Sequence, residues 1–257
     1  MIIQLIRSAS LRMEYAGKQF WVDPMFAEAG SLPPIPNSPN PRPNPLVGLP
    51  FDIDRLPVPD AVLLTHNHPD HFDPSAADRL PKEIPFFCQP EDAAAIQSHR
   101  FAHVRAIDSS LEWEGIRIYR TGGKHGTGAI GEMMGPVSGF VLEAEGEPTL
   151  YLTGDTIWCD EVEEAIRRYR PSVIVCFAGD ARFLEGGPII MDKEDVAALA
   201  AAAPGSRILV AHMESWNHCL LSRDELAQYL RDEDLLARVD IPRDGDTLSY
   251  SQVPTSS

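Results

Sequence analysis

Short runs of β-branched, aromatic and aliphatic residues alternate with amphipathic segments along most of the chain. Such runs are typical of buried strands, and apolar positions three or four residues apart are typical of helices. Strands are predicted at residues 18–22, 61–64, 115–119, 139–142, 149–152, 172–177 and 207–210. Helices are predicted at residues 160–170, 192–203 and 222–230, the last opening with a capping box at Ser222 and Glu225. This alternation predicts an α/β fold.

A proline-rich segment at about residues 24–59 interrupts this pattern. It holds 11 of the 23 prolines, and proline removes a backbone donor, so regular helix and central strand are not expected there. We expect a single domain of residues 1–257 with this segment inserted as a long loop. The loop would select the substrate, with Arg42 and Asn44 as contacts, or form the interface of a homo-oligomer.

Composition narrows the classes of partner. The chain has 22 basic and 38 acidic side chains and a formal net charge of −16, which would repel nucleic acid. No stretch approaches the roughly 20 apolar residues of a membrane-spanning helix, so no membrane span is expected. The four cysteines form no CxxC pair, and the start of the chain has no signal-like apolar run. We therefore expect a cytoplasmic protein with free thiols and a small-molecule substrate.

Residue types that bind metals follow five of the predicted strands. Asp23, His66, Asp155 and His212 come at or just after the end of a strand, and His125 follows another strand through a short glycine turn. Strand ends at one edge of a sheet bring together loops that are distant in sequence. The sequence therefore predicts one site at this edge.

Residues 65–71, with the sequence THNHPDH, are the densest part of this site. They offer three imidazoles and a carboxylate, which suit zinc and neighbouring transition metals. One ion could not use these four side chains together with His125, Asp155 and His212, so two divalent ions are predicted. Zn²⁺ is the first choice, and Mn²⁺ or Fe²⁺ also suits these ligands. The alternatives are one ion with a surplus histidine, or a solvated polar turn.

The segment His66-Asn67-His68-Pro69-Asp70-His71 matches the HxHxDH signature of the metallo-β-lactamase fold. Lys124-His125-Gly126, Thr153-Gly154-Asp155-Thr156 and Ala211-His212 follow in the expected order. Within that superfamily the chain resembles the group containing ascorbate-6-phosphate lactonase and the phospholipase D that cleaves N-acylphosphatidylethanolamine. The segments at residues 134–140 and 212–218 resemble a bacterial branch described only as metal-dependent hydrolases. The resemblance implies a four-layer αββα sandwich.

The resemblance also implies a role for each candidate ligand. His66, His68 and His125 would hold one ion. Asp70, His71 and His212 would hold the second ion, and Asp155 would bridge the two. Side chains expected beside the ligands or facing the substrate are Asp23, Lys124, Asn217 and His218.

Charge counting favours hydrolysis of a small anion. Two divalent ions bring four positive charges, and Asp70 and Asp155 oppose only part of them. A metal-bound water ionises near pH 7 and supplies a hydroxide nucleophile, while Asp70 or Asp155 could pass a proton to the leaving group and His212 completes the catalytic set. We expect a metal-dependent hydrolase of a small, anionic ester, lactone or phosphodiester. The alternatives are an iron- or manganese-dependent redox enzyme of the same fold and a non-catalytic metal-binding protein.

Overall fold

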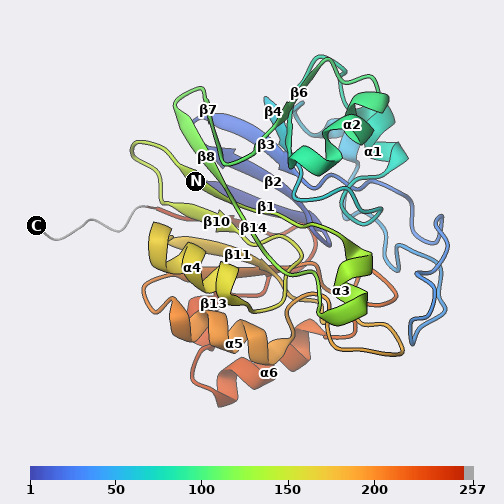
Figure 1. The fold of residues 1–257 in the computed structure, drawn as a ribbon, viewed down its shortest axis with the longest axis vertical. Coiled ribbons are helices and arrows are strands. Elements are labelled where there is room, and N and C mark those ends of the chain that lie inside the picture. Colours follow the sequence, from blue (N-terminus) through green and yellow to red (C-terminus); the bar gives the residue numbers. More distant parts are fainter. Residues whose placement is uncertain (252–257) are drawn as a thin grey trace, which may run out of the picture.

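Two seven-stranded sheets pack face to face in the computed structural model, which describes residues 1–251 (Figure 1). The first sheet, in the order β14-β1-β2-β3-β4-β5-β6, contains β1 (Ile2–Arg7), β2 (Ser10–Tyr15), β3 (Lys18–Val22), β4 (Ala61–Leu63), β5 (Pro85–Cys88), β6 (His103–Ala106) and β14 (Thr247–Ser249). The second, in the order β13-β12-β11-β10-β9-β8-β7, contains β7 (Ser110–Trp113), β8 (Ile116–Thr121), β9 (Gly139–Glu143), β10 (Leu150–Leu152), β11 (Val173–Phe177), β12 (Arg207–Ala211) and β13 (Val239–Asp240).

Helices cover the outer face of each sheet (Figure 1). The first sheet carries α1 (Pro74–Arg79) and α2 (Ala93–Ser98), and the second carries α4 (Asp160–Tyr169), α5 (Lys193–Ala202) and α6 (Arg223–Asp232). Single 3₁₀ turns, η1 (Ile53–Arg55), η2 (Pro90–Asp92) and η3 (Leu236–Arg238), and the short helix α3 (Gly128–Met134) lie in the connections. The α/β fold and its four layers are confirmed. Among the described residues, no helix combines the length and the apolar character that a bilayer crossing requires.

Strand β11 shows why the central strands read as unbroken apolar runs. Val173, Val175 and Phe177 pack between the sheets, whereas Ile174 and Cys176 face the helical layer. Both faces of the strand are buried, as is usual where helices cover a sheet that contains parallel strands. This double burial gives the sheet edge a rigid base.

The parallel parts of both sheets point toward the same edge. Strands β3 to β6 are parallel to one another, and so are β10 to β13. Loops that follow these strands therefore gather where the two sheets meet. This edge carries the side chains that the sequence marks as ligands.

The proline-rich segment runs along the side of the molecule where α3 also lies (Figure 1). The guanidinium of Arg7 is fully buried and donates hydrogen bonds to the carbonyl oxygens of Met25, Ala27 and Val47. The three carbonyl oxygens are acceptors for its two terminal nitrogens, in place of water. The N-terminal strand thus holds the start of the segment and its later part at Val47 beside the ligand-bearing edge.

Candidate metal centre

Two of the predicted side chains leave their strands through an uncommon backbone conformation. Asp23 directly follows β3 with a φ of 47°, and His212 directly follows β12 with a φ of 64°. The backbone N–H of Asp23 donates to Leu63 in the neighbouring strand, and that of His212 donates to Ser8 in the hairpin between β1 and β2. Left-handed residues other than glycine persist where the surroundings hold them. Both side chains are thereby turned toward the gap between the sheets.

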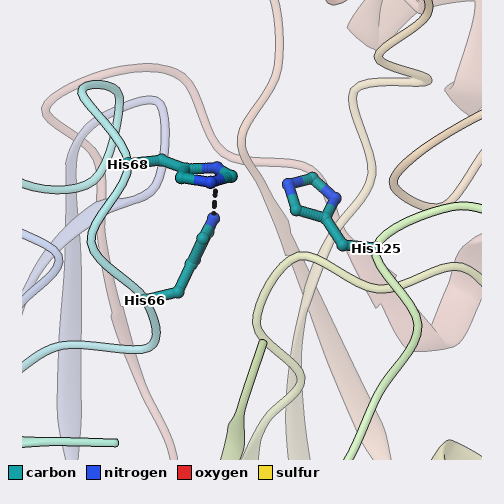
Figure 2. Close-up of side chains that lie close together, drawn as sticks. All are labelled: His66, His68 and His125. Atoms are coloured by element: carbon teal, nitrogen blue, oxygen red, sulfur yellow. Dashed lines mark hydrogen bonds between the residues drawn. The ribbon is translucent and has the colours of Figure 1, made fainter. Parts of the chain in front are cut away.

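Three histidines form the first cluster (Figure 2). The ligand atoms of His66, His68 and His125 all lie within 4.8 Å of one another. Nε2 of His66 is 3.0 Å from Nδ1 of His68, and the His125 ring faces them from a separate loop. His66 and His125 are buried, whereas His68 is partly exposed. Three convergent imidazole nitrogens with one exposed member suit a metal ion with an open position.

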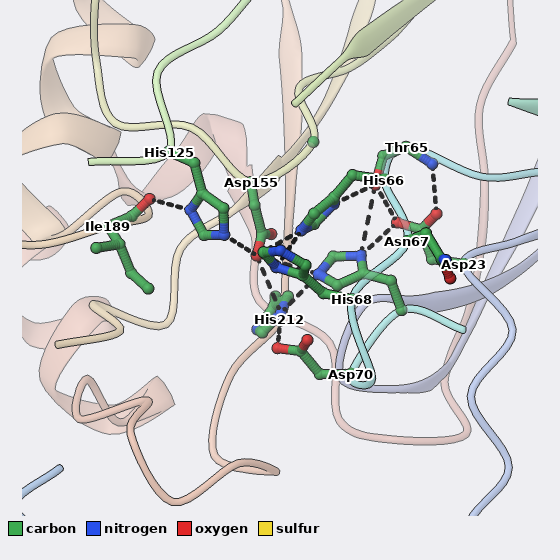
Figure 3. A network of polar contacts seen from close by, with 12 residues as sticks. Asp23, Thr65, His66, Asn67, His68, Asp70, His125, Asp155, Ile189 and His212 are labelled. Atoms are coloured by element: carbon green, nitrogen blue, oxygen red, sulfur yellow. Dashed lines mark hydrogen bonds and ion pairs between the residues drawn. The ribbon is translucent and has the colours of Figure 1, made fainter. Parts of the chain in front are cut away.

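The second cluster contains Asp70, His71, Asp155 and His212, all of them buried. Figure 3 labels Asp70, Asp155 and His212 of this cluster. Nε2 of His212 lies 3.1 Å from Nε2 of His71 and 3.3 Å from Oδ2 of Asp70. Nε2 of His71 lies 3.1 Å from Oδ2 of Asp155. Two imidazoles and two carboxylates facing one another form a donor set typical of zinc, manganese or iron sites.

Asp155 joins the two clusters. Its Oδ2 lies 3.9 Å and 3.7 Å from Nε2 of His66 and His125, and 3.1 Å and 3.6 Å from Nε2 of His71 and His212. Its Oδ1 is buried and has no hydrogen-bond partner among residues 1–251. Buried carboxylate oxygens are rarely left alone, so this atom points to a missing partner. The residues present therefore fit a pair of metal ions with Asp155 between them.

The ring nitrogens that point away from the clusters have partners of their own. Nδ1 of His71 is 2.8 Å from Oδ2 of Asp23, and Asp23 also accepts hydrogen bonds from the backbone and hydroxyl of Thr65. Nδ1 of His66 lies 3.2 Å from the Thr65 hydroxyl, and Nδ1 of His125 lies 2.8 Å from the carbonyl oxygen of Ile189. Such contacts fix the tautomer and the direction of a ligand. Asp23, expected beside the ligands, lies in contact with His71 and Thr65.

Opposite electrostatic effects act on the two clusters. Burial lowers the pKa of His66 and of His125, which favours neutral imidazoles. Burial also acts to lower the pKa of His71, but the carboxylates of Asp155 and Asp23 outweigh it and raise that pKa to about 10. Burial would raise the pKa of Asp155, but His212 and His71 hold it well below its usual range. Without metal, the second cluster is therefore an ion-paired group, whereas His66 and His125 are neutral.

The other three predicted side chains lie around this centre in different ways. His218 is buried, its Nδ1 has no hydrogen-bond partner among the described residues, and burial lowers its pKa to about 4. Asn217 is buried and holds the proline-rich segment. Lys124 is exposed, and its ammonium lies 3.5 Å from a carboxylate oxygen of Glu161. Of these three, only His218 presents an unpartnered polar atom near the ligands.

Sequence reasoning missed two outer contacts. The carbonyl oxygen of Ile189 accepts from His125, and a backbone carbonyl leaves no mark on the residue type. The sulfur of Cys219 lies 3.6 Å from Nδ1 of His212. Cys219 and His212 are seven residues apart, and they meet because residues 213–218 turn back between them. Nothing in the sequence indicates that turn.

A hollow of about 410 Å³ opens beside the first cluster. It is lined by residues 123–128 together with Gly131, Glu132 and Gly135, so His125 forms part of its wall. Most of the lining is glycine, which leaves the hollow wide because no side chains fill it. The hollow therefore borders the first cluster on the side of His125.

Comparison with known proteins identifies the family. The family model of the beta-lactamase superfamily domain matches residues 22–213, which include all seven candidate ligands. The UPF0173 protein YddR of Bacillus subtilis (strain 168) is 39% identical over 254 residues, which cover 97% of this chain and 100% of YddR. The chain belongs to the UPF0173 family of the metallo-β-lactamase superfamily. A UPF0173 metal-dependent hydrolase of Xanthobacter autotrophicus (strain ATCC BAA-1158 / Py2) is 26% identical over 96% of each chain.

Two solved structures are similar over nearly their full length. The isothiocyanate hydrolase from Delia radicum gut bacteria has 37% sequence identity and a TM-score of 0.93, covering 98% of this chain and 100% of its own. A possible metal-dependent hydrolase from Veillonella parvula DSM 2008 has 33% identity and a TM-score of 0.94, covering 97% and 99%. This protein is accordingly a metal-dependent hydrolase, and its two clusters suit a binuclear site. These comparisons show the superfamily and the family, and the narrower resemblance to the lactonase and phospholipase D group stays a prediction.

Proposed function

We propose that this protein hydrolyses a small isothiocyanate with two metal ions held at the described clusters. Three histidines, His66, His68 and His125, would hold one ion. Asp70, His71 and His212 would hold the other, and Asp155 lies between the two clusters. The observation that carries the substrate class is the 37% identity to an isothiocyanate hydrolase over 98% of the chain, with a TM-score of 0.93.

Metal ions bound here would lower the pKa of a water molecule and polarise the group that it attacks. The protein contributes by orienting the ligands: Asp23 holds His71, and the carbonyl oxygen of Ile189 holds His125. Burial of the clusters excludes bulk water and strengthens each electrostatic contact. The partly exposed His68 marks the open side from which a substrate arrives.

The proposed reaction converts R–N=C=S and one water into the amine R–NH₂ and carbonyl sulfide, O=C=S. The water oxygen forms a bond to the central carbon, and the bond between that carbon and the nitrogen breaks, while the R–N bond stays intact. Both hydrogens of the water end on the nitrogen, so no oxidant or further reactant is needed. Asp70 and Asp155 are the carboxylates placed to carry a proton from the water toward the nitrogen.

An uncharged substrate agrees with the surroundings of the centre. Partly buried apolar side chains of the proline-rich segment, α3 and residue 183 pack on the cluster that contains Trp216 and Cys219; they are Leu32, Ile35, Ile130, Met134 and Phe183. The nearby cations are engaged, since Lys124 pairs with Glu161 and Arg182 pairs with Asp180 and Asp192. This environment favours an apolar R group over a charged one.

The ester, lactone and phosphodiester substrates predicted from the sequence are the alternatives within the same class of hydrolase. Each presents an electrophilic carbon or phosphorus, whose oxygen the ions that these clusters would hold could polarise. The redox alternative is separated by metal analysis and an absorption spectrum of protein purified without added metal. A redox enzyme would contain iron or manganese and would consume an oxidant during turnover.

The deciding experiment measures benzyl isothiocyanate loss and benzylamine formation by the purified, zinc-loaded chain. The same preparation is assayed with a phenyl ester, a γ-lactone and bis(p-nitrophenyl) phosphate. We expect turnover of the isothiocyanate, its loss after chelation and its return with zinc. Asp155→Asn, which keeps the size of the side chain but removes its charge, is the matched inactive control.

Faster turnover of an ester, lactone or phosphodiester than of the isothiocyanate would contradict the proposed substrate while leaving the hydrolase intact. Equal rates for the wild type and Asp155→Asn would contradict the site assignment. Absence of hydrolysis of all four probes by a protein that holds two ions would contradict the proposed function as a whole.

A further inference from the structure

His212 differs from the other buried ligands in the group that contacts its outer nitrogen. The outer nitrogens of His66, His71 and His125 face oxygen atoms. Nδ1 of His212 instead faces the sulfur of Cys219 at 3.6 Å, a distance at which a thiol sulfur acts as a weak hydrogen-bond acceptor. No other hydrogen-bond partner of this nitrogen occurs within residues 1–251.

The backbone around Cys219 holds the thiol in this place. The backbone N–H of Cys219 donates to the carbonyl oxygen of Trp216 at 3.0 Å, and Cys219 forms an isolated antiparallel bridge with Ala181. The N–H of Leu221 donates to the carbonyl oxygen of Gly179, also at 3.0 Å. Cys219 is 9% exposed, so its side chain has little room to move.

Gly179 provides the space that this contact requires. A Cβ atom at Gly179 would lie 2.2 Å from the carbonyl oxygen of His212 and 3.1 Å from the sulfur of Cys219. The first distance is far below any real carbon–oxygen contact, and the glycine φ is not in the left-handed region. Close approach, and not backbone freedom, therefore explains the glycine. Gly179 therefore allows the backbone at His212 and the side chain of Cys219 to approach closely.

We infer that Cys219 is a positioning residue for the second metal ion. Its sulfur accepts a hydrogen bond from Nδ1 of His212, so the proton that His212 keeps when an ion binds stays on Nδ1, and Nε2, directed at the second cluster, is the nitrogen that would bind the ion. The geometry on the other side of the ring agrees, because Nε2 lies 3.1 Å from Nε2 of His71 and 3.3 Å from Oδ2 of Asp70. Loss of such an outer contact typically weakens metal binding about 10- to 100-fold. This inference rests on the ligand set of the proposed function.

The test is a metal titration of the chelator-stripped protein in competition with a chromophoric zinc chelator. Cys219→Val keeps the volume of the side chain and removes the acceptor, whereas Cys219→Ser keeps an acceptor. We expect Cys219→Val to weaken binding of one of the two zinc ions by about 10- to 100-fold and to leave the other unchanged. We expect Cys219→Ser to bind the second ion within a few-fold of the wild type.

Cys176→Val is the matched control for the loss of a buried thiol. Cys176 is fully buried in β11 and packs in the helical layer away from the ligands, so both zinc affinities should stay at the wild-type level. As an independent readout, the ¹⁵N spectrum of the zinc-loaded protein should show a slowly exchanging Nδ1 proton on His212. This proton should persist in Cys219→Ser and exchange faster in Cys219→Val.

Wild-type affinity for both ions in Cys219→Val would overturn the inference, and so would an equal loss in Cys219→Ser and Cys219→Val. These outcomes are distinct from failure of the proposed function. A wild-type protein that binds two ions and hydrolyses no probe overturns only the function. A wild-type protein that binds no metal overturns both.

Discussion

Asn44 and Asn217 form two hydrogen bonds with each other and join the proline-rich segment to the loop after β12. The side-chain oxygen of Asn44 accepts from the backbone N–H of Asn217 at 2.8 Å, and its amide nitrogen donates to the side-chain oxygen of Asn217 at 2.8 Å. Asn217 also donates to the carbonyl oxygen of Ile35 and to the hydroxyl of Ser38. The segment is therefore attached to the same loop that begins with a metal ligand.

Asn217→Ala should release the proline-rich segment from the loop after β12 without removing a metal ligand. A buried polar group left without its hydrogen-bond partner costs about 1–3 kcal/mol, so we expect the free energy of unfolding to fall by about that amount. Urea denaturation measures the fall, and proteolysis should become faster within residues 31–44. Asn40→Ala removes only a local contact with the backbone of Arg42 and should change stability by less than about 0.5 kcal/mol. Equal stability of Asn217→Ala and Asn40→Ala would contradict the anchoring role.

Asp23→Asn should weaken metal binding without unfolding the protein. The Asp23 carboxylate orients His71 and accepts two hydrogen bonds from Thr65, so an amide in its place reverses one of these contacts. We expect a loss of about 10- to 100-fold in affinity for one ion, measured by metal titration. Asp73→Asn, a change of another buried carboxylate that caps α1, should leave metal affinity unchanged. A similar loss in both variants would argue for a general structural effect.

The strands and ligands that could be predicted have a local signature. Residues 172–177 form an apolar run because both faces of β11 are buried, and the pattern reads the same in the sequence. The ligands between His66 and His71 lie in six consecutive residues, so chemistry and spacing are visible together. Capping of α6 by Ser222 and Glu225 was likewise readable, because a capping box involves only neighbouring residues.

The elements that could not be predicted lack such a signature. The helices α1 and α2 have six residues each, fewer than two turns, and so show no clear period. Strands β1 and β2 carry buried polar residues at the hairpin between them, Arg7 and Ser10, which hide their apolar character. Asn44, expected to face a substrate, is instead fully buried and hydrogen-bonded to Asn217, which is distant in the sequence. Tertiary contacts of this kind cannot be read from one chain segment.

The metal-free protein should become less stable as the pH rises above neutrality. His71 has a folded-state pKa of about 10, and that of His212 is also raised, because Asp155 outweighs the effect of burial on each. A raised pKa contributes stability that is complete below the unfolded value of about 6.5 and is lost as pH rises through the folded value. Urea denaturation in EDTA between pH 7 and pH 10 should show this decline, and His71→Gln should reduce it. A pH-independent stability in that range would contradict the ion-paired cluster.

The affinity for zinc should change with pH in the opposite direction to the stability of the metal-free protein. An ion requires unprotonated imidazole, so binding at pH 8 must displace the protons of His71 and His212, and affinity should rise with pH. The released protons can be counted with an indicator dye in weakly buffered solution. His71→Gln should release about one proton fewer than the wild type. His66→Gln should leave proton release from the second cluster unchanged, because burial keeps His66 neutral before metal arrives.

Asp155→Ala should remove metal and activity together. Its Oδ2 lies within 4 Å of Nε2 atoms in both clusters, so its loss would take a ligand atom from each of them. Metal analysis after gel filtration should show less than one ion per chain, and hydrolysis should fall to the level of the chelator-stripped wild type. Asp180→Ala removes a carboxylate that pairs with Arg182 outside the clusters and should keep both ions. An Asp155→Ala protein that retained two ions and its activity would show that the centre is not held together by this carboxylate.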